Sequence, residues 1–131
     1  MHDAKVLLVS DPLEEYPTHA GIITALGYSV VICNSFEEGA RRIGRENFDF
    51  VIVGQGGPAF EGRCVLERAT QLHSQIPILV VARSLNLHNY LEAMDLGAID
   101  YLERPEPEDV AWVLETQLKR PHDLLVGHGM N

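Results

Sequence analysis

The residues whose types could do chemistry stand where short apolar runs of the sequence end. Ser10 and Asp11 follow the run Lys5–Val9, and the glycine-rich segment Gly54–Gly57 follows the run Phe50–Val53. Bare backbone N–H groups in such a segment can bind an anion or the phosphate of a cofactor. The segment lacks the Lys-Ser/Thr pair of a P-loop and the full GxGxxG spacing, so a loop of small residues without a ligand is the other interpretation.

Cys64 is a second candidate, because it lies near the start of a predicted helix, where the helix N-terminus can lower the pKa of a thiol. No general base is evident near it in the sequence, which favours a structural cysteine over an enzyme. The six histidines show no ligand spacing, and Cys33 and Cys64 form neither a disulfide framework nor a zinc motif. We therefore expect no metal, no cofactor and no catalysis.

Five apolar runs alternate along the chain with five helical patterns. The predicted strands are Lys5–Val9, Tyr28–Ile32, Phe50–Val53, Ile78–Ala82 and, as a weaker edge strand, Asp100–Leu102. The predicted helices are Thr18–Leu26, a helix opened by the capping box Ser35–Glu38, Arg63–His73, Asn86–Leu96 and Pro107–Lys119. This alternation predicts an α/β fold with a five-stranded, doubly wound parallel sheet of flavodoxin type in a three-layer sandwich. The working surface of such a sheet lies beyond the carboxyl ends of its strands.

Four segments at or near this edge resemble the receiver domains of bacterial response regulators. Asp49–Gly62 is similar to the family's run of an aspartate, four apolar residues, the phosphoacceptor aspartate and a downstream proline, acidic residue and glycine. Gly97–Pro105 resembles the signature Gly-Ala-x-x-Tyr-x-x-Lys-Pro, in which the bond before the proline is usually cis. Lys5–Pro12 and Pro77–Ala82 match the first and fourth strands. The resemblance covers residues 4–118 and implies the receiver fold and a role in two-component signalling.

The resemblance also implies a phosphorylation site, and the chain departs from the family at nearly every position of it. Phosphoryl transfer to a carboxylate needs the nucleophile, a Mg²⁺ ion held by further carboxylates, a cation and a hydroxyl. The corresponding positions are Ser10 and Asp11 for the acidic pair, Gly54 for the phosphoacceptor, Ala82 for the hydroxyl and Arg104 for the lysine. Because Gly54 has no side chain, we expect a degenerate receiver, a pseudo-receiver, that is not phosphorylated at this site.

Tyr101 occupies the family's switch-aromatic position, whose rotamer normally follows the hydroxyl that Ala82 lacks. Two outcomes are open. The ring fills the space beside Ala82 permanently and locks one conformation, or it is half-buried with its hydroxyl in water.

Trp112 lies nearly opposite the apolar face of the last predicted helix, and outward tryptophans are enriched at protein interfaces. In the family, the face formed by the fourth helix, fifth strand and fifth helix is the usual dimer and partner surface. Here we expect that face to contain Asn89, Glu92, Tyr101, Trp112 and Val113. We therefore expect a protein partner or output domain and a homodimer through this face; the alternative is that the tail Pro121–Val126 covers Trp112.

The 10 basic and 19 acidic residues give a net charge of −9, which would repel a nucleic-acid backbone. No apolar run is long enough to span a bilayer and no leader opens the chain, so we expect a cytoplasmic protein. Residues 1–119 are expected to form the receiver-like domain, and 120–131 a tail or the start of a linker. The predicted function is phosphorylation-independent signalling by protein contact, including regulation of a transcription output domain; the alternative is a sensor that binds a small ligand or cofactor at Gly54–Gly57.

Overall fold

The computed structural model describes residues 4–10 and 16–118. The strands of this part of the chain are β1 Lys5–Val9, β2 Ser29–Cys33, β3 Phe50–Gly54, β4 Ile78–Ala82 and β5 Asp100–Glu103. Its helices are α1 Tyr16–Ala25, α2 Phe36–Arg45, α3 Arg63–Gln71, α4 Leu87–Asp95 and α5 Pro107–Leu118. Every predicted strand and helix is present, with small shifts at the ends. Asp11 and the tail 120–131 lie outside the described residues.

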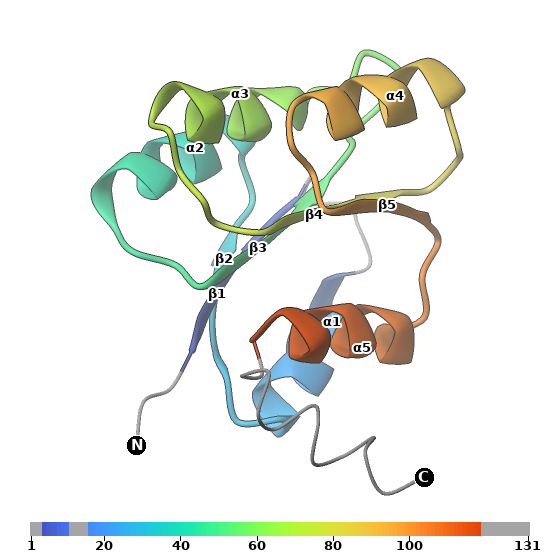
Figure 1. Cartoon of the computed structure of the whole chain (residues 1–131). Coiled ribbons are helices and arrows are strands. Elements are labelled where there is room, and N and C mark those ends of the chain that lie inside the picture. The colour runs from blue at the N-terminus through green and yellow to red at the C-terminus, as the bar shows by residue number, and fades with distance from the viewer. Residues whose placement is uncertain (1–3, 11–15, 119–131) are drawn as a thin grey trace, which may run out of the picture.

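The strands form one parallel sheet in the order β2-β1-β3-β4-β5. Helices α2, α3 and α4 cover one face of the sheet, and α1 and α5 cover the other, which makes three layers (Figure 1). The chain winds from β1 outward to β2, crosses back to β3 and continues to β5, so the sheet is doubly wound. The predicted α/β flavodoxin-like fold is confirmed.

The core lies on both faces of the sheet, because β3 and β4 in its centre are buried at every residue. This explains their continuous apolar sequences, since a strand covered by helices on both faces has no side exposed to water. β5 is an edge strand, as predicted, and only Tyr101 among its residues is buried. Within the described parts of the chain, no helix combines the length and apolar character needed to cross a bilayer.

Only one of the two hydrogen bonds of the predicted capping box is present at the start of α2. Ser35 is the N-cap, and its hydroxyl accepts a hydrogen bond from the backbone N–H of Glu38. The Glu38 carboxylate does not reach back to Ser35; it accepts hydrogen bonds from Arg41, Arg42 and Arg45 along the same helix. The hydrogen bond from Arg41 is the main reason that the pKa of Glu38 lies below its usual value.

Candidate functional site

The carboxyl edge of the sheet brings together the strand ends at which the sequence placed the degenerate phosphorylation site. Ser10 is buried directly after β1, and its backbone N–H donates to the carbonyl of Cys33. Gly54 ends β3 and the buried Ala82 ends β4, so neither strand end presents a carboxylate or a hydroxyl. Among residues 4–10 and 16–118, no three His, Cys, Asp or Glu side chains form a group that could hold a metal ion.

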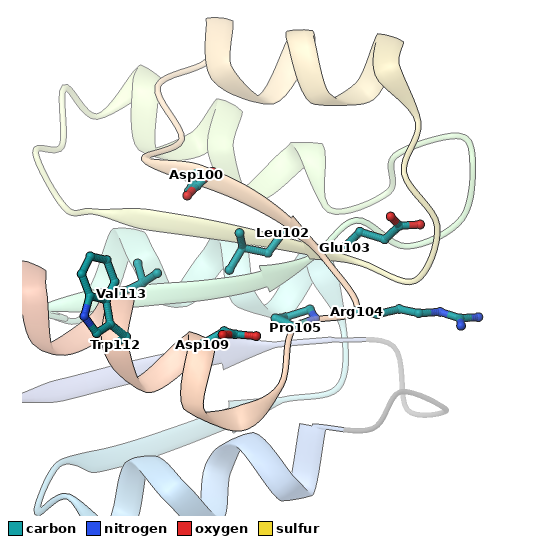
Figure 2. Close-up of a pocket in the computed structure, with 8 residues that line it drawn as sticks. All are labelled: Asp100, Leu102, Glu103, Arg104, Pro105, Asp109, Trp112 and Val113. Atoms are coloured by element: carbon teal, nitrogen blue, oxygen red, sulfur yellow. The ribbon is translucent and has the colours of Figure 1, made fainter.

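Arg104, at the position of the family's lysine, directly follows β5 and is hydrogen-bonded to the end of β4 and the loop after it. Its backbone N–H donates to the carbonyl of Ala82 at 2.8 Å, and its Nε donates to the carbonyl of Arg83 at 2.9 Å. Its backbone has a positive φ of 44°, and its side chain is exposed. The Arg104–Pro105 bond is trans, so the family's usual cis bond is not found here. The guanidinium thus extends along the outside of the edge (Figure 2).

A buried hydrogen bond joins the loop after β3 to β5. The hydroxyl of Tyr101 donates to Oε1 of Gln55, and each of the two residues is 5% exposed. β4 lies between β3 and β5, and the small side chain of Ala82 is also buried beside the pair on the same face. The interpretation that Tyr101 is half-buried with its hydroxyl in water is therefore wrong. The ring is inward, and the partner of its hydroxyl is Gln55. Sequence reasoning missed Gln55, whose only signal was a polar residue directly after a buried strand.

The Gln55–Tyr101 pair continues into a polar network that holds α4. The backbone N–H of Asn86 donates to the Tyr101 hydroxyl at 3.3 Å, and the Asn86 side chain caps α4 by accepting from the N–H of Asn89. The Asn89 amide then donates to the carbonyl of Pro58 at 3.1 Å. Tyr90 packs edge-on against Tyr101, with ring centroids 5.6 Å apart. The network thus ties together β5, α4 and the loops after β3 and β4.

This burial corrects part of the expected partner surface. Asn89 is 3% exposed and Tyr101 is buried, so neither presents its side chain to a partner. Burial raises the pKa of the Tyr101 hydroxyl, an effect that the Asn86 N–H opposes and the Glu103 charge adds to. The hydroxyl is therefore a neutral hydrogen-bond donor at neutral pH.

The Gly54–Gly57 loop binds one of the chain's own carboxylates. Glu61 Oε1 accepts a hydrogen bond from the backbone N–H of Gly57 at 2.7 Å. Gly56 has a φ of 85°, and a Cβ there would lie 2.5 Å from the same oxygen. An N–H group that was a candidate for an anion or cofactor is thus already paired. This geometry favours the interpretation of the loop without a ligand.

Gly62 shows why the downstream part of this motif needs a glycine. A Cβ at Gly62 would overlap the carbonyl oxygen of Gly54, while the Gly62 N–H donates to the carbonyl of Gln55. The motif residues Glu61 and Gly62 therefore shape the loop after β3 even though Gly54 carries no phosphoacceptor.

Cys64 has the environment of a structural cysteine. Its thiol is half-buried and donates a weak hydrogen bond to the carbonyl of Phe36 across the α2–α3 contact. Burial raises its pKa, and Glu67 raises it further, which disfavours the thiolate that a nucleophile needs.

The exposed part of the expected partner surface lies around β5 and α5. Trp112 is 70% exposed and, with the half-buried Val113, lines a groove of about 340 Å³. Glu92 turns toward α3, where its carboxylate pairs with Arg63 at 2.7 Å. On α4 the face that carries Leu87 and Leu91 is exposed, at 65% and 57%, which the sequence pattern did not predict. The alternative cover for Trp112, Pro121–Val126, lies outside the described residues.

Comparisons with known proteins agree with the fold. No protein-family model matches the chain. Transcriptional regulatory protein ZraR of Escherichia coli (strain K12) is 24% identical over 120 residues, which are 91% of this chain and 27% of ZraR. Response regulator protein FleR of Pseudomonas aeruginosa is 29% identical over 102 residues, 78% of this chain and 22% of FleR. The chain thus spans about a quarter of the length of these relatives.

Solved structures give the same result. The CheY-like response regulator receiver domain protein of Methanospirillum hungatei superimposes with a TM-score of 0.81 at 25% identity, over 89% of this chain and 94% of that one. The receiver domain of sensor histidine kinase PA1611 of Pseudomonas aeruginosa shares the fold, with a TM-score of 0.74 at 17% identity over 88% of this chain and 98% of that one. This chain therefore has the fold of response-regulator receiver domains, and its sequence is similar to those of response regulators.

Proposed function

We propose that this chain is a pseudo-receiver that regulates its output by protein contact and not by phosphorylation of the family's site. The single observation that carries the proposal is the glycine at the end of β3, where the phosphoacceptor would stand. A glycine offers no oxygen nucleophile, and covalent phosphoryl transfer requires one.

The rest of the edge supports the proposal. Ser10 replaces one carboxylate of the acidic pair, and Ala82 has no hydroxyl to bind an arriving phosphoryl group. Tyr101 is already inward and bonded to Gln55, which replaces the missing hydroxyl as its partner. The switch aromatic therefore has one stable position that needs no phosphoryl group, and the network through Asn86 transmits that position to α4.

The output is proposed to be a protein or a transcription domain. ZraR and PmrA of Pectobacterium parmentieri are both named as transcriptional regulatory proteins. This chain matches 27% of the length of ZraR and 46% of that of PmrA. The surface for the contact is the exposed part of the α4-β5-α5 face, where Trp112 stands out. The homodimer expected from the sequence would use this same face, and it remains a prediction.

Intact mass spectrometry after incubation with acetyl phosphate and Mg²⁺ tests the central claim. We expect no phosphoryl adduct on this chain and one adduct on an ordinary receiver domain treated in parallel. The control establishes that the donor and the metal are active. A single stable phosphoryl adduct on this chain would contradict the proposal, because a residue other than Gly54 would then be the phosphoacceptor.

A further inference from the structure

The groove between β5 and α5 is lined by apolar and acidic side chains. Leu102 and Pro105 from β5 and its following turn, and Trp112 and Val113 from α5, supply the apolar surface. Three carboxylates belong to the same lining: Asp100, Glu103 and Asp109. Figure 2 shows Asp100 on the β5 side and Asp109 on the α5 side, with Leu102 between them in this view.

The elements around this groove carry charge of one sign. Helix α4, strand β5 and helix α5 contain no lysine or arginine between their first and last residues. They contain seven acidic residues: Glu92, Asp95, Asp100, Glu103, Glu108, Asp109 and Glu115. The nearest basic side chain of the lining is that of Arg104, just beyond β5.

The carboxylates of the groove differ from those on the opposite edge of the molecule. Around α2 and α3, each of Glu38, Glu46 and Glu67 lies within an ion pair with an arginine or lysine of the chain. No ion pair among the described residues includes Asp100, Glu103 or Asp109. Each of these three accepts a hydrogen bond from a backbone N–H, which orients it without neutralising its charge.

We infer that the β5–α5 groove binds a short, extended segment of another protein that carries basic and apolar side chains. The inference rests on the proposed function and adds the chemistry of the partner. A guanidinium or ammonium group of the segment lies between Asp100 and Asp109 and against the indole of Trp112, where the ring face attracts a cation. An apolar side chain of the segment covers Leu102 and Val113.

Two further features favour such a segment over a second copy of the chain. β5 is an edge strand, so one side of its backbone faces no other strand and can pair with an extended peptide. A symmetric dimer would bring two acidic faces together, since the same patch meets itself across a two-fold axis. Like charges across an interface oppose association, whereas a basic segment removes the repulsion.

Trp112 is the single tryptophan of the chain, so tryptophan fluorescence reports on the groove alone. We would titrate the full chain with a blocked peptide of alternating arginine and leucine and record the emission of Trp112. The expected result is a saturable change that weakens as salt is added, because Glu103 and Asp109 are exposed and Asp100 is only partly buried. Matched peptides of alternating glutamate and leucine, and of alternating arginine and glycine, should bind at least about threefold more weakly.

A pair of protein variants separates the groove from the overall charge. Asp100→Asn with Asp109→Asn keeps the hydrogen-bond acceptors and should weaken binding at least about threefold. Glu37→Gln with Glu67→Gln removes the same charge from α2 and α3 and should leave binding unchanged. Equal effects of the two pairs, or equal binding of the acidic peptide, would overturn the inference.

Sedimentation velocity over a concentration series tests whether a second copy of the chain occupies the groove instead. A dimer that is lost in Trp112→Ala, together with no response to the arginine–leucine peptide, would assign the groove to a second copy and overturn the inference. That result would leave the proposed function intact, because the latter fails only if acetyl phosphate modifies the chain.

Discussion

At the carboxyl edge of the sheet, Gln55 accepts a buried hydrogen bond from the hydroxyl of Tyr101. The pair is buried, and the Tyr101 hydroxyl stays neutral because burial raises its pKa. A buried polar group costs little when it is paired and much when its partner is removed. The pair therefore specifies one ring position and couples β5 to the loop after β3.

At the residue scale, we predict that Tyr101 and Gln55 are energetically coupled, which a double-mutant cycle measures. Tyr101→Phe should lower the free energy of unfolding by about 1–3 kcal/mol, because the Gln55 oxygen and the Asn86 N–H both lose a partner. Combining it with Gln55→Leu should cost less than the sum of the single changes, since no buried oxygen of residue 55 is then left unpaired. Urea unfolding followed by circular dichroism measures all of these values. Strict additivity would contradict the coupling.

At the scale of elements, the position of α2 depends on a glycine that faces the sheet. Gly39 is buried, and a Cβ there would lie 2.6 Å and 2.7 Å from the two Cγ atoms of Val9 on β1. Val9 is buried in a central strand and β-branched, so its side chain has few ways to move aside. The close approach of α2 to β1 therefore requires the absence of a side chain at position 39.

Two glycine-to-alanine substitutions test this with opposite signs. Gly39→Ala should destabilise the protein by about 1–3 kcal/mol, because overpacking forces Val9 or the helix to shift. Gly21→Ala in α1 is the matched control, since nothing lies within 4 Å of its Cβ position. It should stabilise by about 0.5–1 kcal/mol through the better helix propensity of alanine. Thermal or urea unfolding measures the change in stability of both variants. A stabilising effect of Gly39→Ala would contradict the close packing of α2 on Val9.

At the scale of the whole molecule, charge is distributed unevenly over the sheet. Five of the arginines stand on α2 and α3: Arg41, Arg42, Arg45, Arg63 and Arg68. Helix α4, strand β5 and helix α5 contain acidic residues but no lysine or arginine. Between the two sides, β1 is followed by Ser10 and β3 ends at Gly54, and neither residue carries a carboxylate.

A Mg²⁺ titration makes this a prediction for the folded molecule. Mg²⁺ prefers several oxygen ligands, so it should not raise the melting temperature of this chain. Ser10→Asp with Gly54→Asp restores two carboxylates beside Asp11 and should gain a saturable, Mg²⁺-dependent stabilisation. Gly54 is not among the glycines with positive φ, so its backbone accepts a side chain. Saturable stabilisation of the unmodified chain by Mg²⁺ would contradict the loss of the metal site.

The fold and the departures from the family's site were accessible from the sequence because they depend on local patterns and on residue identity. Continuous apolar runs predicted the buried strands, and the 100° step of a helix turned Trp112 outward without any knowledge of its neighbours. The absence of an oxygen nucleophile at position 54 is a matter of covalent structure. No packing can supply it.

The tertiary structure decided which polar groups meet. Gln55 and Tyr101 are 46 residues apart, and they come into contact because β4 alone separates their strands. Asn89 is buried and Glu92 turns to Arg63 because α4 packs between α3 and β5, which helical periodicity does not specify. The carboxylate of Glu61 reaches Gly57 because Gly56 adopts a positive φ. The Gln55–Tyr101 and Arg63–Glu92 contacts join segments remote in sequence, and only the packed sheet sets the distances between such segments.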